Sequence, residues 1–253
     1  MPHALVRRPG PRLADGLLTH QARVPVDVEL AERQWQRYVE ALRSAGWDVT
    51  EVDPADDCAD AVFVEDALVL FGDLAVVTLP GAPSRRPETE AAERAAAQLG
   101  LTVARITQPA TLDGGDVLKI DRTAYVGVGG RTDHAAVEQL TSLLEPRGWT
   151  VVGVPISKVL HLKSAVTALP DGTVIGHPDF VDDPSVFPKF AEVPEPSGSH
   201  VVLLDERRLL MAADAPRSAE RFRSMGYDVV EVDISEFEKL EGCVTCLSVR
   251  HRG

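Results

Sequence analysis

A helix that ends near a glycine and is followed by an alternating apolar strand recurs along the chain, and this repeat constrains the fold most. The amphipathic segments cover residues 31–42, 88–99, 134–144 and 215–224. The glycines that follow them are Gly46, Gly100, Gly148 and Gly226. Glycine suits the C-terminal cap of a helix because it adopts the left-handed backbone without a steric penalty. A valine-rich run of period two follows each glycine, which predicts a strand with one buried face.

The spacing of this repeat favours a closed array over an open sheet. Successive glycines lie about 50, about 50 and about 80 residues apart, which leaves room for a degenerate fifth unit at residues 169–199. Units of this length cannot bury their faces alone, so they stack or close radially. An open doubly wound sheet is the alternative, but residues 127–130 lack the spacing of a dinucleotide-binding loop. We therefore predict one α/β domain, residues 1–253, with a radial arrangement.

The composition is that of a globular protein, with 44% hydrophobic and 26% charged residues. A net charge of −13 disfavours nucleic acid and anionic membrane surfaces as partners, and it suits a cationic substrate, although solubility alone explains it. No apolar run reaches the ~18 residues of a membrane helix. Pro9, Gly10 and Pro11 stand where a secretory signal would be apolar. Three cysteines are too few for a disulfide framework, so we expect a cytoplasmic protein.

Two of the cysteines, Cys243 and Cys246, form a Cys-x-x-Cys pair near the C-terminus. A zinc site would need a second Cys or His pair at suitable spacing, and none lies nearby, so no metal is expected. A redox pair should open a helix after a strand, whereas residues 244–249 have the pattern of a strand. The third interpretation is a single nucleophilic thiol, although an isolated cysteine is more often buried and inert.

His161 and Asp113 are each ambiguous when considered alone. His161 lies between two leucines, where a histidine is more often a core residue than a catalyst. Asp113 precedes a Gly-Gly pair and a strand, which suits a tight turn that exposes an acid at the floor of a pocket, but a plain turn explains it equally well.

Adjacent acids, Glu65 and Asp66, interrupt an apolar segment that we interpret as a strand. Burying two carboxylates inside a strand costs roughly several kcal/mol unless cations or hydrogen-bond donors contact them. A stiff proline-rich loop then presents Arg85 just ahead of a helix. Arginine pairs bidentately with a carboxylate, although many loop arginines are only solvated.

These residues and the blocks around them resemble the dimethylarginine dimethylaminohydrolases, within the guanidino-group-modifying superfamily. The matching blocks follow the family's order and cover residues 60–69, 79–90, 111–118, 127–132, 161–164 and 241–249. Residues 3–7 and 31–34 also match, so the resemblance spans nearly the whole chain. It implies a five-bladed α/β propeller (the pentein fold) of pseudo-symmetric ββαβ units, in agreement with the repeat.

The resemblance also implies hydrolysis of asymmetric dimethylarginine and monomethylarginine to citrulline plus dimethylamine or methylamine, with no cofactor. By motif position, Cys246 is the nucleophile, His161 the general acid and base, and Asp113 a carboxylate that holds the guanidinium. The implied substrate-binding residues are Leu17, Asp60, Glu65, Asp66, Arg85, Arg131, Leu240 and Glu241.

Each of these binding residues has an implied role. Asp66 binds the guanidinium with support from Glu65, and the two arginines clamp the α-carboxylate with Asp60 nearby. The backbone carbonyls of residues 240–241 meet the α-amino group. Leu17, or Leu18 if the register shifts by one, belongs to a lid loop.

Several alternatives remain open from the sequence. A deiminase or hydrolase of arginine or of another ω-substituted guanidine would use the same Cys-His-Asp set, and amidinotransfer differs only in the group that resolves the intermediate. A guanidine-binding protein without catalysis would not need the thiol. A thiol-redox role through Cys243 and Cys246 is a further option. The expected partner is a small molecule, and a homodimer is kept open.

Overall fold

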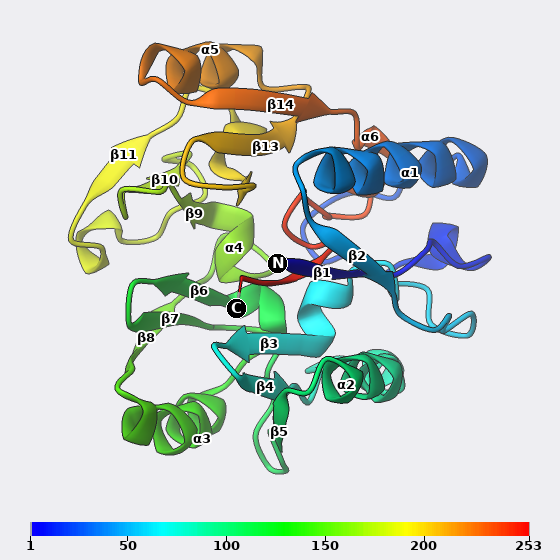
Figure 1. Cartoon of the computed structure of the whole chain (residues 1–253), viewed down its shortest axis with the longest axis vertical. Helices are drawn as coiled ribbons and strands as arrows, with labels where there is room; N and C mark the ends of the chain where they lie inside the picture. Colours follow the sequence, from blue (N-terminus) through cyan, green and yellow to red (C-terminus); the bar gives the residue numbers. More distant parts are fainter. Residues whose placement is uncertain (1, 253) are drawn as a thin grey trace.

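The computed structural model describes residues 2–252 and arranges five three-stranded sheets around a central axis, as Figure 1 shows. From the innermost to the outermost strand, the sheets are β15 (Val249–His251), β1 (His3–Val6) and β2 (Asp48–Glu51); β3 (Leu68–Phe71), β4 (Leu74–Val77) and β5 (Thr102–Arg105); β6 (Val117–Ile120), β7 (Thr123–Val128) and β8 (Thr150–Pro155); β9 (Val166–Ala168), β10 (Val174–Gly176) and β11 (Phe190–Glu192); β12 (Val201–Leu203), β13 (Arg208–Ala212) and β14 (Asp228–Val232). The predicted five-bladed α/β propeller is confirmed.

The helices lie mostly on the outside of this ring (Figure 1). The α-helices are α1 (Val28–Ser44), α2 (Glu88–Gln98), α3 (His134–Leu144), α4 (Leu162–Ala165), α5 (Pro216–Ser224) and α6 (Ser235–Glu238). The short 3-10 helices are η1 (Leu13–Asp15), η2 (Val64–Ala67), η3 (Pro83–Arg85), η4 (Gly114–Asp116), η5 (Glu145–Arg147), η6 (Pro184–Val186) and η7 (Pro196–Ser199). No helix among residues 2–252 is both long and apolar enough to cross a membrane.

Every blade uses the same pairing. Its inner and middle strands are antiparallel, and its middle and outer strands are parallel. In four blades a helix crosses between the two parallel strands, as parallel pairing requires a long connection. The first blade is completed by β15 from the C-terminal end, which pairs with β1 and closes the ring. With β15 in place, each of the five sheets has an inner, a middle and an outer strand.

The four glycines of the repeat adopt the left-handed backbone that the sequence predicted. Their φ angles are +89° at Gly46, +75° at Gly100, +76° at Gly148 and +93° at Gly226. The residue after each glycine donates its N–H back into the last helical turn, as from Trp47 to the Leu42 carbonyl over 3.1 Å. This is the Schellman pattern, and it aims the chain into the outer strand of the blade.

The predicted helices are confirmed with small shifts at their ends, and α3 has the predicted bounds. The degenerate fifth unit is the blade of β9, β10 and β11, where residues 177–189 hold a 3-10 turn in place of a longer helix. Two predictions were wrong. Residues 244–247 form a turn, with the strand beginning only at Val249, and Glu65 and Asp66 lie on η2 and not in a strand. Both segments are fully buried, so apolar side chains point to every side and no strand period is needed.

Candidate active site

A small cavity of about 20 Å³ lies where η2, η3, the loop before α4 and the C-terminal turn converge. It is lined by residues Leu17, Asp60, Phe63, Asp66, Arg85, Arg131, Leu160, His161, Leu240, Glu241, Gly242 and Cys246. Nine of the eleven predicted site residues therefore face one space, although they come from six distant blocks of the chain. Asp113 and Glu65 do not line it, and Phe63, Leu160 and Gly242 line it without having been predicted.

Two glycines bring the acidic segments together. A Cβ on Gly115 would lie 2.6 Å from an Asp66 carboxylate oxygen and 2.7 Å from His161 Nδ1. A Cβ on Gly114 would lie 2.1 Å from the Glu65 carbonyl oxygen. Side chains at these positions would push η4 away from η2, so the Asp-Gly-Gly-Asp motif has a steric reason. The Gly115 N–H donates to Asp66 Oδ1 over 2.8 Å, which fixes that carboxylate.

His161 is held among carboxylates. Its Nε2 lies 3.0 Å from Asp113 Oδ2, and its Nδ1 lies 3.8 Å from Asp66 Oδ1. Burial alone would lower the pKa of His161, but the charges of Asp66 and Asp116 and the hydrogen bond to Asp113 outweigh it and raise the pKa to about 9. His161 is therefore an imidazolium at neutral pH, with a proton on each ring nitrogen.

Asp113 is fully buried behind His161. Its Oδ1 accepts the Gly81 N–H over 2.8 Å, and its Oδ2 faces His161. Arg131 approaches the same oxygen at 3.9 Å. Asp113 orients the imidazolium without lining the cavity, and the acidic residues that line it are Asp60, Asp66 and Glu241.

Arg85 is buried in a network of its own. Its guanidinium binds Asp66 Oδ2 over 2.6 Å and both oxygens of Glu88, over 3.1 and 2.8 Å, and it also donates to two backbone carbonyls. Burial would raise the pKa of Asp66, but His161 and Arg85 outweigh it and lower the pKa to about 2. The Arg131 side chain, in contrast, donates no hydrogen bond to any group within residues 2–252. It only approaches Asp113, at 3.9 Å, so its guanidinium has free donors.

Cys246 lies on the turn before β15, 6% exposed at the cavity wall. Its Sγ is 3.4 Å from Cys243 Sγ, and both thiols are free. The shared hydrogen bond lowers the pKa of the Cys243 thiol and raises the pKa of the Cys246 thiol, so the pair gives up one proton readily and resists losing the second. Thr245 also contacts Cys243 Sγ, at 3.2 Å from Oγ1.

A loop from Gly16 to Gln21 covers the cavity. The Leu17 N–H donates to both oxygens of Asp60, over 3.0 and 3.2 Å. One oxygen of Glu241 accepts three consecutive N–H groups of the loop, from residues 19, 20 and 21, over 3.0, 2.5 and 2.8 Å. Glu241 has a φ of +59°, outside the usual range for a side-chain-bearing residue. This carboxylate contact was not predicted, because the role implied for Glu241 used only its backbone carbonyl.

Glu65 lies on the far side of η2 from the cavity. Its Oε1 meets Lys163 Nζ at 2.6 Å and Arg250 at 3.3 Å, while its N–H donates to the Cys246 carbonyl over 3.2 Å. Its contact with the cavity wall therefore runs through the backbone of the turn that carries Cys246. Asp116, which was not predicted, receives the N–H of Leu162 and the Thr132 hydroxyl and thereby anchors α4 next to His161.

Asp66, Asp113 and His161 have donor atoms that all lie within 4.8 Å of one another, which is close enough for three ligands of one metal ion. The ion pairs of the imidazolium with the two carboxylates account for this closeness. Ligation would require a neutral imidazole, which the pKa of about 9 disfavours.

Comparisons with known proteins agree with this geometry. Residues 82–207 match the arginine deiminase family model. A dimethylarginine dimethylaminohydrolase of Streptomyces coelicolor is 64% identical over 98% of this chain and 96% of its own length. The chain belongs to the dimethylarginine dimethylaminohydrolase family. A second member of this family, from Pseudomonas aeruginosa, is 34% identical over 98% of both chains.

Solved structures of dimethylarginine dimethylaminohydrolases superpose on nearly the whole chain. An adduct with S-methyl-L-thiocitrulline has a TM-score of 0.92 at 33% identity, covering 98% of this chain and 99% of that one. A Pseudomonas aeruginosa cysteine-to-serine mutant complexed with citrulline has a TM-score of 0.91 at 33% identity, covering 98% of each chain. The N-terminal domain of a cyanobacterial arginine dihydrolase shares the fold, with a TM-score of 0.88 at 21% identity over 98% of this chain and 97% of that one.

Proposed function

We propose that this chain hydrolyses asymmetric dimethylarginine and monomethylarginine to citrulline plus dimethylamine or methylamine, acting as one catalytic domain over residues 1–253. The observation that carries the proposal is the convergence of a thiol, an imidazolium and two carboxylates on one closed cavity, in a member of the dimethylarginine dimethylaminohydrolase family. The contents of the cavity fit a planar cation whose central carbon needs a nucleophile and whose leaving amine needs a proton.

The guanidinium is received by Asp66 and Asp60. Both carboxylates line the cavity, and Asp66 keeps its charge because its pKa is lowered to about 2. Charge-assisted hydrogen bonds from a guanidinium to carboxylates fix its plane and keep it protonated, and hence electrophilic. Burial raises the pKa of Asp60, against the opposing charge of Arg85, so a bound cation also restores full charge at that residue.

The nucleophile is the thiolate of Cys246. A cation bound beside the thiol favours its thiolate, and Cys243 shares a proton with it in the free enzyme. The thiolate adds to the central guanidinium carbon and forms a carbon–sulfur bond, giving a tetrahedral adduct. The positive charge of the guanidinium and the negative charge of the thiolate cancel, so the adduct is neutral. It becomes positively charged only when the leaving nitrogen is protonated.

His161 supplies that proton. It is protonated in the free enzyme and is oriented by Asp113, so it acts first as general acid toward the departing methylamine or dimethylamine. Loss of the amine leaves a thiouronium on Cys246 and a neutral imidazole. His161 then takes a proton from water, and the hydroxide adds to the same carbon. Collapse returns the carbon–sulfur electron pair to sulfur, and the hydroxyl proton passes to solvent, where it protonates the released amine; the products are citrulline and the Cys246 thiolate.

The amino-acid end of the substrate lies toward Arg131 and the lid. Arg131 has the free donors to pair with an α-carboxylate, whereas the donors of Arg85 are mostly taken by Asp66 and Glu88. We therefore place Arg131 as the main carboxylate partner and Arg85 as the residue that holds Asp66. The carbonyls of residues 240–241 are offered to the α-amino group, since both residues line the cavity.

The lid must open for substrate to enter. A cavity of about 20 Å³ holds little more than a water molecule, far less than an arginine. The contacts of Asp60 with Leu17 and of Glu241 with residues 19–21 therefore describe a closed lid. The lid excludes water while the thiouronium forms, which limits loss of the intermediate before the amine has left.

Replacement of the nucleophile tests the proposal. Cys246→Ser is expected to lose turnover while retaining the binding of dimethylarginine measured by calorimetry. Cys58→Ser is the matched control, because that thiol is also buried but does not line the cavity. Undiminished citrulline formation by Cys246→Ser would overturn the assignment. Parallel assays with dimethylarginine, monomethylarginine, arginine and agmatine separate the hydrolase from a deiminase, because preference for plain arginine would move the function to deimination.

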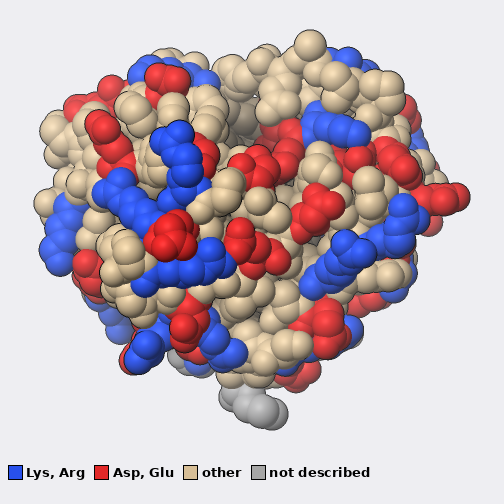
Figure 2. Space-filling model, turned by 90° about the horizontal axis from the view of Figure 1, so that it is seen from above, with Lys and Arg blue, Asp and Glu red and all other residues tan. Residues whose placement is uncertain are grey.

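The expected setting is a small-molecule enzyme of the cytoplasm that does not bind nucleic acid. Three free thiols and the excess of negative charge support this setting. Acidic and basic side chains are interspersed on the face seen in Figure 2, with no continuous basic stripe on that face. A homodimer is tested by sedimentation equilibrium of the purified chain.

A further inference from the structure

A second, larger cavity of about 340 Å³ lies on the propeller axis, apart from the catalytic cavity. Its wall is built from the innermost strand of every blade: β3, β6, β9, β12 and β15 all contribute residues. None of the residues that line the catalytic cavity lines this one. The volume is that of a small-molecule site. The arrangement therefore provides a second binding space, which the proposed hydrolysis does not use.

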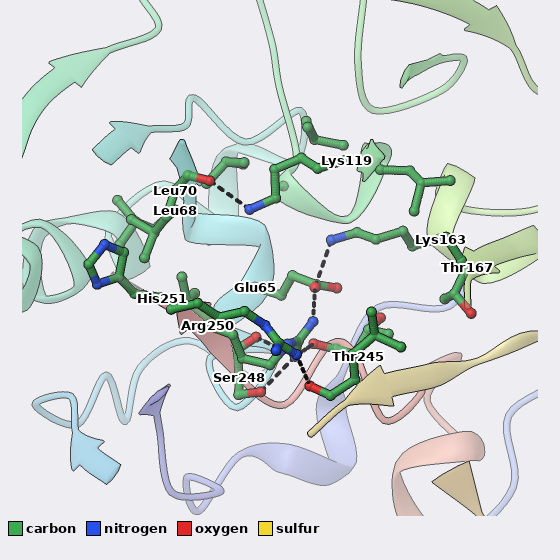
Figure 3. Close-up of a pocket in the computed structure, with 18 of the residues that line it drawn as sticks. Glu65, Leu68, Leu70, Lys119, Lys163, Thr167, Thr245, Ser248, Arg250 and His251 are labelled. Atoms are coloured by element: carbon green, nitrogen blue, oxygen red, sulfur yellow. Dashed lines mark hydrogen bonds and ion pairs between the residues drawn. The ribbon is translucent and has the colours of Figure 1, made fainter. Parts of the chain in front are cut away.

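Four cations line this axial cavity: Lys119, Lys163, Arg250 and Arg252. The one carboxylate that lines it is Glu65, which Lys163 and Arg250 already share, at 2.6 and 3.3 Å. Figure 3 shows the ammonium groups of Lys119 and Lys163 directed into the space and Glu65 between Lys163 and Arg250. When Lys119 is protonated, four positive charges against one negative charge leave an excess of three, in a chain whose net charge is −13.

Lys119 is the cation with the least compensation. Its Nζ donates to the Leu70 carbonyl over 2.6 Å and lies 5.5 Å from the Phe71 ring, but it pairs with no carboxylate among residues 2–252. Protein surrounds the ammonium group, and the residue reaches solvent through the cavity. Burial, followed by repulsion from Lys163 and Arg250, lowers the pKa of Lys119 to about 7. An anion in the cavity would relieve this repulsion.

Backbone carbonyls orient the two arginines, and the Glu65 carboxylate, which Arg250 shares with Lys163, cancels only part of the charge. Arg250 donates to the carbonyls of Thr245 and Ser248, over 3.2 and 3.0 Å, and Arg252 donates to the Leu203 carbonyl. Carbonyl oxygens fix the direction of a guanidinium but carry no net charge. The cavity thus presents cations held in place by the inner strands, which is the preorganisation that a charged ligand needs.

We propose that the axial cavity is a binding site for a small, multiply charged oxyanion, with Lys119, Lys163 and Arg250 as its partners. The shared chemistry is that of a di- or tricarboxylate or a phosphate, since both bring several acceptor oxygens to ammonium and guanidinium donors. A monovalent anion would not match an excess of three positive charges. This proposal is independent of the hydrolytic reaction, because it uses no residue that touches the substrate cavity.

The test is titration calorimetry at pH 6.5 with sodium citrate and, separately, inorganic phosphate, with ionic strength held constant by sodium chloride. Wild-type protein is expected to bind at least one of the two anions saturably with one site per chain. Lys119→Met is expected to weaken that binding about tenfold, the effect of losing one charge-assisted hydrogen bond. Lys189→Met is the matched control, because Lys189 also donates to a single carbonyl, that of Asp171, but lies outside the cavity.

Two results overturn the proposal: no saturable binding of either anion, or equal affinity in Lys119→Met and wild type. The second result would assign the anion to another cationic surface, including the arginines of the catalytic cavity. Binding of only citrate or only phosphate supports the proposal and identifies the acid class. If Lys119→Met does not fold, Lys119→Gln replaces it, because glutamine removes the charge and keeps an N–H donor for the Leu70 carbonyl. An affinity equal to that of the wild type in this variant overturns the proposal.

Discussion

The two cavities of this propeller shift the pKa of a cation that lines them in opposite directions. In the catalytic cavity His161 stands among carboxylates, and its pKa is raised to about 9. In the axial cavity Lys119 stands among other cations, and its pKa is lowered to about 7. The ordinary order of an imidazole at 6.5 and an ammonium at 10.5 is thereby reversed within one fold. Burial lowers both values; at His161 the neighbouring carboxylates outweigh it, whereas at Lys119 burial is the largest cause and the neighbouring cations add to it.

The difference shows what each cavity is prepared for. The carboxylates around His161 are matched by the imidazolium and Arg85, which leaves a rigid set of acids and bases for proton transfer. The cations around Lys119 exceed their one carboxylate, which leaves a charge for a ligand to complete. Removing a charge from the catalytic cavity should therefore alter the rate of the reaction, and removing a charge from the axial cavity should alter the binding of an anion.

Removal of His161 gives the largest expected effect on this comparison. His161→Gly leaves the carboxylates of the catalytic cavity without their imidazolium and the leaving amine without its acid, so turnover should fall about 10²–10⁴-fold. Because Cys246 remains, a covalent thiouronium adduct should be detectable by mass spectrometry of acid-quenched reactions. His177→Gly serves as control, since His177 lies outside both cavities. A variant that turns over normally, or one that never shows the adduct, would contradict the two-step assignment.

Asp113→Asn should produce the next largest effect, because it weakens the field that holds the proton on His161. The pKa of His161 should fall from about 9 toward its usual 6.5, and kcat/KM should fall by roughly tenfold or more as the imidazole loses its orientation. An NMR titration of the His161 ring measures the shift directly. An unchanged titration would remove Asp113 as the positioning residue.

The same shift has a consequence for stability. A pKa that is raised on folding stabilises the folded state fully below the unfolded value of 6.5, and this stabilisation is lost as pH rises through about 9. Wild-type stability to urea should therefore decline over this window. The decline should be smaller in Asp113→Asn, where the folded and unfolded values lie closer together.

Glu241→Gln should have a moderate effect, directed at the lid. A neutral amide oxygen accepts the three N–H groups of residues 19–21 less strongly than a carboxylate does, so the closed lid should be weakened by about 1 kcal/mol. KM for dimethylarginine should rise about fivefold, with a smaller change in kcat. Glu220→Gln, exposed on α5, makes the same charge change away from the cavity. Equal KM values in the two variants would show that the Glu241 contact does not govern closure.

Local patterns in the sequence predicted the blades well, because each helix, its glycine cap and its strand depend on neighbouring residues. The left-handed angles at Gly46 and Gly226 follow from this local chemistry. The turn that carries Cys246 was missed, because its apolar residues Val244 and Leu247 directly precede the strand that begins at Val249 and are both buried in one hydrophobic cluster. Burial on all sides removes the period on which strand prediction depends.

Contacts between blades could not be predicted from the sequence patterns alone. His161 and Asp113 are 48 residues apart and belong to different units, so their pairing at 3.0 Å required either the resemblance or the structure. Lys119 occupies a position in β6 that alternates with buried Leu118, like any solvent-facing lysine of a strand. Only closure of the ring turns that position toward the axis, and with it the charge that distinguishes the second cavity.

The smallest expected effect belongs to Cys243→Ser, which tests whether the thiol pair is part of the chemistry or only its neighbour. Serine keeps a hydrogen-bond donor close to Cys246, and His161 and Asp66 are untouched, so kcat/KM should stay within about threefold of wild type. The pH dependence of Cys246 alkylation by iodoacetamide should simplify, because a pair of thiols 3.4 Å apart loses its protons in two linked steps and a single thiol loses one. An alkylation profile that still has two steps would trace the linkage to a group other than Cys243. A loss of turnover beyond about a hundredfold would show that the second thiol acts in catalysis. The catalytic cavity would then depend on a proton shared between sulfurs as well as on the one that His161 holds.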